Sequence, residues 1–189
     1  RTDANNSFTL APQELPSAPI ELYFDIEAAP DKDLVYLHGI LVVNTQDQSE
    51  TFIPLVAREP EGEANAWNQF QHVIAHYPDA PVYHFCPYEA QTVRRLAEQY
   101  GTIIDIDELL SRFVDIHKRI VDAVTLPIES YALKHIARWI GFEWRDSSAN
   151  GAQSICWYDN WLDSQDEQYL NDILKYNEDD CRATFWVKR

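Results

Sequence analysis

Methionine is absent from this sequence, and basic residues, glycine and cysteine are scarce. Lys and Arg number 15 against 31 Asp and Glu, so the formal net charge is −16. Affinity for nucleic-acid phosphates depends largely on Lys and Arg releasing counterions. A chain of this charge is not expected to bind nucleic acid tightly by itself. Bound cations, a local basic strip or neighbouring segments of a longer protein would have to contribute.

Long apolar runs are also missing. No stretch approaches the ~18 apolar residues of a membrane span, and the first residues are not expected to be a signal peptide. Cys86, Cys156 and Cys181 are widely spaced and form no Cys-x-x-Cys pair, which indicates reduced, buried thiols in a cytoplasmic protein that does not act at a membrane. Because the chain starts at Arg1 and lacks methionine, we expect a fragment of a longer polypeptide.

The chain does have enough apolar material for one domain with a substantial core, since 46% of its 189 residues are hydrophobic. Residues 1–19 are polar and proline-containing, which predicts an arm or linker, and residues 20–189 are predicted to form the domain. Runs of β-branched and apolar residues predict strands at about 20–27, 34–43, 51–57 and 81–86. Pro54 lacks an amide donor and places the third of these strands at or near a sheet edge.

Helical spacing of apolar residues predicts helices at about 63–77, 88–100, 106–114, 130–140, 157–162 and 167–186. Residues 115–127 are ambiguous between a short strand and a turn. Three strands joined by short turns, followed by strands that alternate with helices, predict an α/β fold. We expect a mixed central sheet, with three antiparallel strands and then parallel strands, and helices on both faces.

Two acids, Asp25 and Glu27, close the first predicted strand. Residues two apart in a strand point to the same face, so the two carboxylates project together. Adjacent like charges are costly unless a cation lies between them, and Mg²⁺ and Mn²⁺ prefer carboxylate oxygens. Asp25 and Glu27 are therefore half of a candidate metal site. The alternative is that Asp25 caps a turn and Glu27 is solvated.

Further acids lie at the start of one predicted helix and within the last one. Glu89 occupies a first helical turn, where the macrodipole favours an anion, so capping is its alternative role. Tyr176 and Asp180 are four apart and share a helix face. A buried carboxylate needs a partner, which a metal would supply. Glu178 and Asp179 point elsewhere, and one or both are expected to be solvated.

The order of these motifs resembles that of the DEDD (DEDDy-type) 3′–5′ exonucleases of the ribonuclease H-like superfamily. The motifs are Asp25-x-Glu27, then His84-x-x-x-Tyr88-Glu89, then Tyr176-x-x-x-Asp180. The chain also resembles the predicted RNase H-like domain of RecB-type bacterial nucleases, through residues 130–134, 139–141, 154–158 and 176–184. The resemblance covers roughly residues 20–187.

This resemblance implies a ribonuclease H-like fold and a metal-dependent nuclease. Asp25, Glu27, Glu89 and Asp180 would hold two Mg²⁺ or Mn²⁺ ions, and Tyr176 would orient the attacking water. Glu89 stands where proofreading enzymes have Asp; its side chain is one methylene longer and still able to reach a metal.

Contacts with substrate are expected from Lys134 and Arg138, which share a helix face, and from Tyr88; Tyr23 and Trp157 are further aromatic candidates for base stacking. The alternatives are surface charge for the basic residues and core packing for the aromatic ones.

The function expected from the resemblance is 3′–5′ exonuclease activity on DNA, rather than on RNA, within a larger nuclease or helicase polypeptide. Two alternatives stay open. One is a catalytically weak or inactive module for nucleic-acid binding or docking in a helicase–nuclease protein, which Glu89 and the acidic charge favour. The other is an RNA-directed or structure-specific endonuclease that uses the same metal site.

Overall fold

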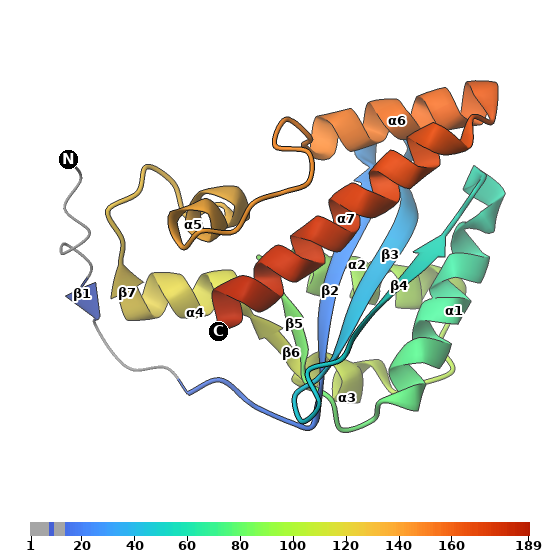
Figure 1. The fold of residues 1–189 in the computed structure, drawn as a ribbon. Coiled ribbons are helices and arrows are strands. Elements are labelled where there is room, and N and C mark those ends of the chain that lie inside the picture. The colour runs from blue at the N-terminus through green and yellow to red at the C-terminus, as the bar shows by residue number, and fades with distance from the viewer. Residues whose placement is uncertain (1–7, 10–13) are drawn as a thin grey trace.

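A computed structural model describes residues 8–9 and 14–189 of the chain. Its centre is a five-stranded sheet of order β4-β3-β2-β5-β6 (Figure 1). β2 pairs antiparallel with β3 and β3 with β4, whereas β5 lies parallel to β2 and β6 parallel to β5. This mixed sheet confirms the fold class predicted from the sequence. The strands are β2 (Ile20–Ala29), β3 (Leu34–Asn44), β4 (Glu50–Val56), β5 (Val82–His84) and β6 (Phe113–Asp115).

Helices cover both faces of the sheet (Figure 1). One face packs against α1 (Glu63–His76), α2 (Tyr88–Tyr100) and α3 (Ile106–Ser111). The other carries α4 (Ile116–Ala123), α5 (Leu133–Trp139), α6 (Gly151–Ser164) and α7 (Glu167–Lys188). Within the described part of the chain, no helix is long and apolar enough to cross a membrane.

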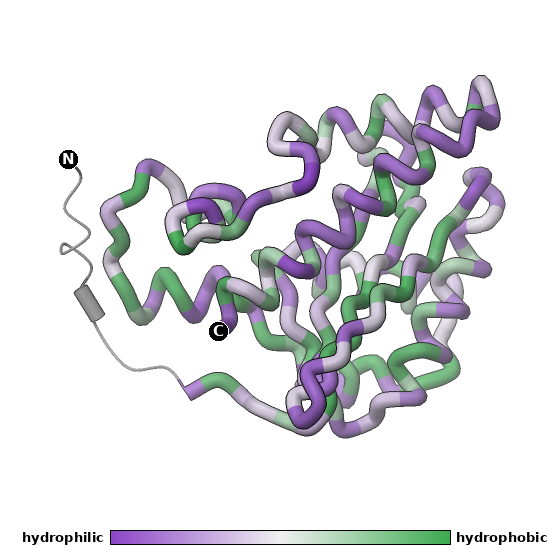
Figure 2. Tube along the Cα trace, viewed as in Figure 1, coloured by the Kyte–Doolittle hydropathy of each residue, from purple (hydrophilic) through white to green (hydrophobic). Residues whose placement is uncertain are grey.

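The central strand β2 is buried on both sides, and its successive side chains point alternately to the two faces of the sheet. Leu22, Phe24 and Ile26 join the core beneath α1, α2 and α3. The intervening side chains, including Asp25 and Glu27, point to the α7 side. Hydrophobic residues gather in the strands, whereas α6 and α7 carry long hydrophilic stretches (Figure 2). The predicted pair of acids therefore lies between the sheet and a partly hydrophilic layer.

The segment after α2 differs from the prediction. The helix expected over 106–114 ends at Ser111, and residues 113–115 form the edge strand β6. Residues 115–127, ambiguous in sequence, give α4 and then β7 (Val124–Thr125). A strand of three residues is too short to show alternation. Asp115 ends it and caps α4 by accepting a hydrogen bond from the Lys118 amide at 3.1 Å.

Helix α6 begins at Gly151, before the predicted start at 157, because the Asn150 side chain caps it through the Gln153 amide. Within the predicted arm, β1 (Phe8–Thr9) pairs with β7, while residues 1–7 and 10–13 lie outside the described residues. The three cysteines are free, but Cys156 is exposed, so the expectation that all are buried is wrong.

Candidate metal centre

Three acids from distant parts of the chain converge between β2 and α7. Asp25, Glu27 and Asp180 each place one carboxylate oxygen within 4.8 Å of those of the other two. Glu27 and Asp180 are only 5% and 9% exposed, and Asp25 is half-buried. Among the described residues this is the only such group of acidic, histidine or cysteine side chains. The structure thus brings together three of the four predicted metal ligands.

The close approach of α7 to the sheet depends on Gly39, which lies opposite Asp25 on β3. A Cβ atom at position 39 would lie 1.6 Å from Asn177 Oδ1, so a larger residue would push α7 away. In the gap, Asn177 Nδ2 donates to Asp25 Oδ2 at 2.7 Å and to Glu27 Oε1 at 3.5 Å. Asn177 Oδ1 is buried and has no hydrogen-bond partner among the described residues. Asn177 therefore holds the two strand acids in place.

The other carboxylates have fixed partners as well. Trp144 Nε1 donates to Asp180 Oδ1 at 2.6 Å, and the Tyr176 hydroxyl donates to the same carboxylate. The Ser154 hydroxyl bonds to Glu27 and lies 2.8 Å from the Tyr36 hydroxyl. These contacts orient each acid but leave carboxylate oxygens directed at one another.

The electrostatics of the triad favour a bound cation. Burial, followed by the charge of Asp180, raises the pKa of Asp25 well above its usual range and that of Glu27 to about 8. Burial also raises the pKa of Asp180 to about 6. A divalent cation would offset both the burial and the mutual repulsion. An all-oxygen donor set of carboxylates fits a hard cation such as Mg²⁺ or Mn²⁺.

Glu89, the fourth predicted ligand, borders the triad but is not one of the three acids within 4.8 Å. It lies in the first turn of α2 and is 4% exposed, and its charge contributes to the raised pKa of Asp25. Its Oε2 is 3.4 Å from His84 Nδ1, which lies 2.7 Å from the Cys86 carbonyl oxygen. His84 therefore has local partners at the strand end.

Tyr176 faces the triad as a neutral phenol. Burial and then the charge of Asp180 raise its pKa far above the usual value, so it donates its proton in a hydrogen bond and does not release it. Lys134 Nζ lies 5.1 Å from the centre of the Tyr176 ring and donates to the Ala149 carbonyl oxygen. Burial lowers the pKa of Lys134. Lys134 therefore lies at the border of the triad.

The remaining predicted substrate contacts lie further out. Arg138 donates from Nη2 to the Ser147 carbonyl oxygen at 2.9 Å, and Tyr88 is 44% exposed beside Glu89 in the chain. Tyr23 is fully buried and its hydroxyl donates a hydrogen bond to Glu21 Oε2, so its ring is unavailable for base stacking. The core alternative is correct for Tyr23.

Of the two acids of which one or both were expected to be solvated, Asp179 is buried and Glu178 is partly exposed. Arg145 donates to Asp179 from Nε at 2.8 Å and from the backbone amide at 2.9 Å. Glu178 is partly exposed but is paired with Arg145 and Arg182. The ion pairs of Arg145 hold the loop before α6 against α7. They thereby position the neighbouring Trp144 to donate its hydrogen bond to Asp180.

Sequence reasoning missed Asn177, Trp144 and Ser154 as partners of the acids. Asn177 had a readable signal, because it lies three residues before Asp180 and so on the same helix face. Trp144 lies on an irregular loop, where no periodicity predicts a contact.

Buried carboxylates gathered between the central strand and the last helix of this mixed sheet form a candidate divalent-metal site. The chain belongs to the RNase_H superfamily, whose family model matches residues 22–189. No curated protein and no solved structure matches it significantly.

Proposed function

We propose that the protein is a divalent-metal-dependent nuclease that acts as a 3′–5′ exonuclease on DNA. The observation that carries the proposal is the convergence of Asp25, Glu27 and Asp180 within 4.8 Å in an RNase_H superfamily chain. Two further statements are predictions from the sequence alone: that the chain is part of a larger nuclease or helicase polypeptide, and that this protein is cytoplasmic.

The four acids have distinct roles in this proposal. Asp25 would contribute oxygens to two cations, with Glu27 and Asp180 on one of them and Glu89 on the other. Bound Mg²⁺ or Mn²⁺ ions would supply the Lewis acidity that activates water and stabilises charge on the phosphate. Asn177 and Trp144 hold Asp25 and Asp180 in the positions this requires.

Tyr176 is proposed to orient the attacking water. Its hydroxyl is already directed at Asp180, and its raised pKa argues against a role as general base. Lys134, close enough to affect the Asp180 carboxylate, would face the substrate phosphate, and Arg138 and Tyr88 would contact the strand further out.

The alternative, a weak or inactive module for docking or nucleic-acid binding, has one observation in its favour. Glu89 lies outside the compact triad and is paired with His84, so the second cation is the less supported of the two. The net charge of −16 favours the same alternative.

The metal site is tested by thermal melting during titration with Mn²⁺ or Mg²⁺. We expect stabilisation of the native chain, by about 2.7 kcal/mol at a hundredfold excess over Kd, and loss of the response in Asp25→Asn. Asp163→Asn, an exposed acid on α6, is the matched control and should respond as the native chain does. An equal response in both variants would refute the site.

The activity is tested on end-labelled single- and double-stranded DNA and RNA. A ladder shortening from the 3′ end of DNA supports the proposal, and internal cuts would instead assign an endonuclease. Metal binding without cleavage of any strand would favour the docking module.

A further inference from the structure

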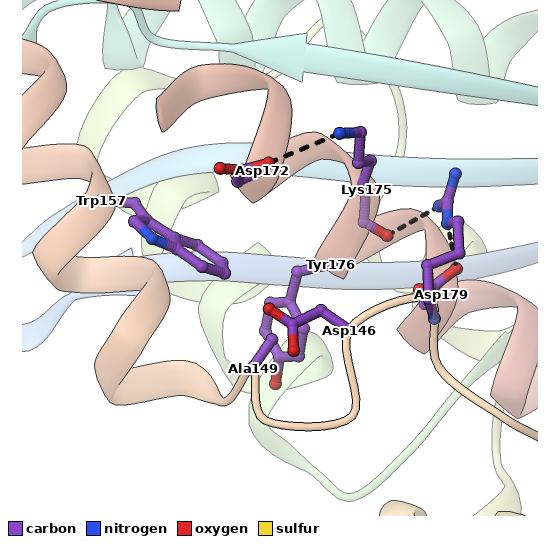
Figure 3. A pocket seen from close by; sticks show the side chains of 8 residues that line it. Asp146, Ala149, Trp157, Asp172, Lys175, Tyr176 and Asp179 are labelled. Carbon is purple, nitrogen blue, oxygen red and sulfur yellow. Dashed lines mark hydrogen bonds and ion pairs between the residues drawn. The ribbon is translucent and has the colours of Figure 1, made fainter. Parts of the chain in front are cut away.

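A pocket of about 300 Å³ adjoins the metal centre between α6, α7 and the loop that joins α5 to α6 (Figure 3). Trp157 from α6 and Tyr176 from α7 both line it. On α6, Trp157 follows by one turn Ser154, whose hydroxyl bonds to Glu27. Tyr176 bonds to Asp180, so one wall of the pocket is also a wall of the triad. The volume is at the lower end of the range of small-molecule sites.

The indole of Trp157 is half-buried, and its N–H makes no hydrogen bond within the described part of the chain. In four other tryptophans the indole N–H does donate a hydrogen bond to an oxygen of the protein: Trp67, Trp144, Trp161 and Trp186. Trp157 thus lines the pocket with an indole whose N–H has no protein partner among the described residues.

The charged residues of the pocket are already paired. Asp179 forms an ion pair with Arg145, and Asp172 Oδ1 lies 3.5 Å from Lys175 Nζ. Asp146 accepts hydrogen bonds from the backbone amide and the hydroxyl of Ser148. The acids outnumber the cations in the lining, which disfavours a phosphate. An uncharged, planar group fits this combination of aromatic wall and neutralised charges.

From these contacts we infer that the pocket binds the base of the nucleotide at the bond to be cleaved, stacked on Trp157. The inference rests on the proposed function, because the base in question belongs to the nucleotide whose phosphate would lie at the metal centre. Lys134 covers the Tyr176 ring, so the indole of Trp157 is the stacking surface. The Trp157 N–H then donates to an oxygen of the same nucleotide. Every base has a π face, so no base preference is expected.

A binding experiment tests the subsite without cleavage. The affinity of the protein with Mg²⁺ is measured by calorimetry for dAMP and for deoxyribose 5′-phosphate, which lacks the base. We expect Trp157→Ala to weaken dAMP binding about tenfold or more, as lost stacking does, and to leave the weaker binding of the sugar phosphate unchanged. Trp157→Phe should restore part of the affinity, whereas Trp139→Ala, an exposed tryptophan outside the pocket, should change nothing.

Steady-state kinetics on single-stranded DNA separate this inference from the proposed function. Trp157→Ala should raise KM for a normal 3′ end and leave it unchanged for an abasic 3′ end. If Trp157→Ala still cleaves DNA and its KM changes equally for normal and abasic 3′ ends, or changes for neither, the subsite is overturned and the proposed nuclease activity stands. Base-dependent dAMP binding lost in Trp157→Ala, without cleavage by the native chain, would support the subsite and refute the nuclease. Equal binding of dAMP by the native chain and Trp157→Ala would overturn the subsite in either case.

Discussion

His38 on β3 is fully buried among the rings of Phe24, Trp67 and Phe70. Neither ring nitrogen has a hydrogen-bond partner among the described residues, and burial lowers its pKa to about 3. Below pH 6.5 the unfolded chain binds a proton that the folded chain excludes. The contribution of His38 to stability should therefore fall as the pH is lowered from 6.5 to 3, by about 1.4 kcal/mol per pH unit at the steepest.

Replacement of His38 by leucine should remove this dependence and stabilise the protein at acid pH. The measurement is urea unfolding of both proteins at pH 7.5 and pH 5. His72→Gln on the exposed side of α1 is the control and should follow the native chain. The same loss of stability in His38→Leu as in the native chain would show that acid sensitivity arises elsewhere.

Gly39 and Asn177 are expected to be coupled, because one leaves the space that the other fills. Gly39→Ala should destabilise the native chain by about 1–3 kcal/mol through overpacking. In an Asn177→Ala background the same change should cost less, since the clashing amide is gone. A double-mutant cycle in urea measures the difference, expected at about 0.5–3 kcal/mol. Strict additivity would mean that α7 moves freely to accommodate the new methyl group.

The same residues show how far sequence reasoning reaches. The shared face of Asp25 and Glu27 follows from strand alternation and was predictable. Asn177 was not assigned, because its contact depends on the absence of a side chain at position 39 on a strand distant in the sequence. Spacing along α7 places Asn177 on the face of Asp180, but the contact with Asp25 also requires the register between β2 and β3, which no local pattern encodes.

At the scale of elements, the long segments were predicted, and of the two three-residue strands of the central sheet β5 was predicted and β6 was not. Helix α7 and strands β2 and β3 show enough turns or alternations to be recognised, whereas β6 has three residues. The loop before α6 has no period at all, yet it supplies the Trp144 partner of Asp180. Its conformation follows from contacts with α7 that form only in the folded chain.

Arg145 is the main link between that loop and α7. Arg145→Ala should destabilise the protein by about 1–3 kcal/mol, because buried Asp179 loses its charged partner. It should also weaken Mn²⁺ binding by releasing Trp144 from Asp180. Arg182→Ala is the matched control and should lower the free energy of unfolding less, because Glu178 keeps its ion pair with Arg145. Urea unfolding and Mn²⁺ titration of both variants provide the test, and equal effects would contradict the link.

For the molecule as a whole, the acidic charge and the buried acids act in the same direction. A chain of net charge −16 repels nucleic acid, and a metal-free triad adds further negative potential at the proposed site as it ionises. Bound divalent cations would reverse the charge locally. The metal would thus link fold stability and strand binding at one position.

This linkage gives the metal-free protein a characteristic dependence on pH. Glu27 has an ordinary pKa of 4.5 and a folded value of about 8, so between these values the folded state holds a proton that the unfolded state has lost. Its contribution to stability is present below pH 4.5 and is lost as the pH rises to 8. His38 acts with opposite sign, but only below pH 6.5. The window from pH 6.5 to 8 therefore isolates the acids.

In that window, the melting temperature measured in EDTA should fall as the pH rises, and the fall should be smaller in Glu27→Gln. Excess Mn²⁺ should abolish the fall in the native chain, because the cation stabilises the ionised triad. Glu61→Gln, an exposed acid, serves as the control for general charge effects. If Glu27→Gln melts with the native pH dependence in EDTA, the triad does not hold protons in the folded state, and metal binding would have to be explained without their release.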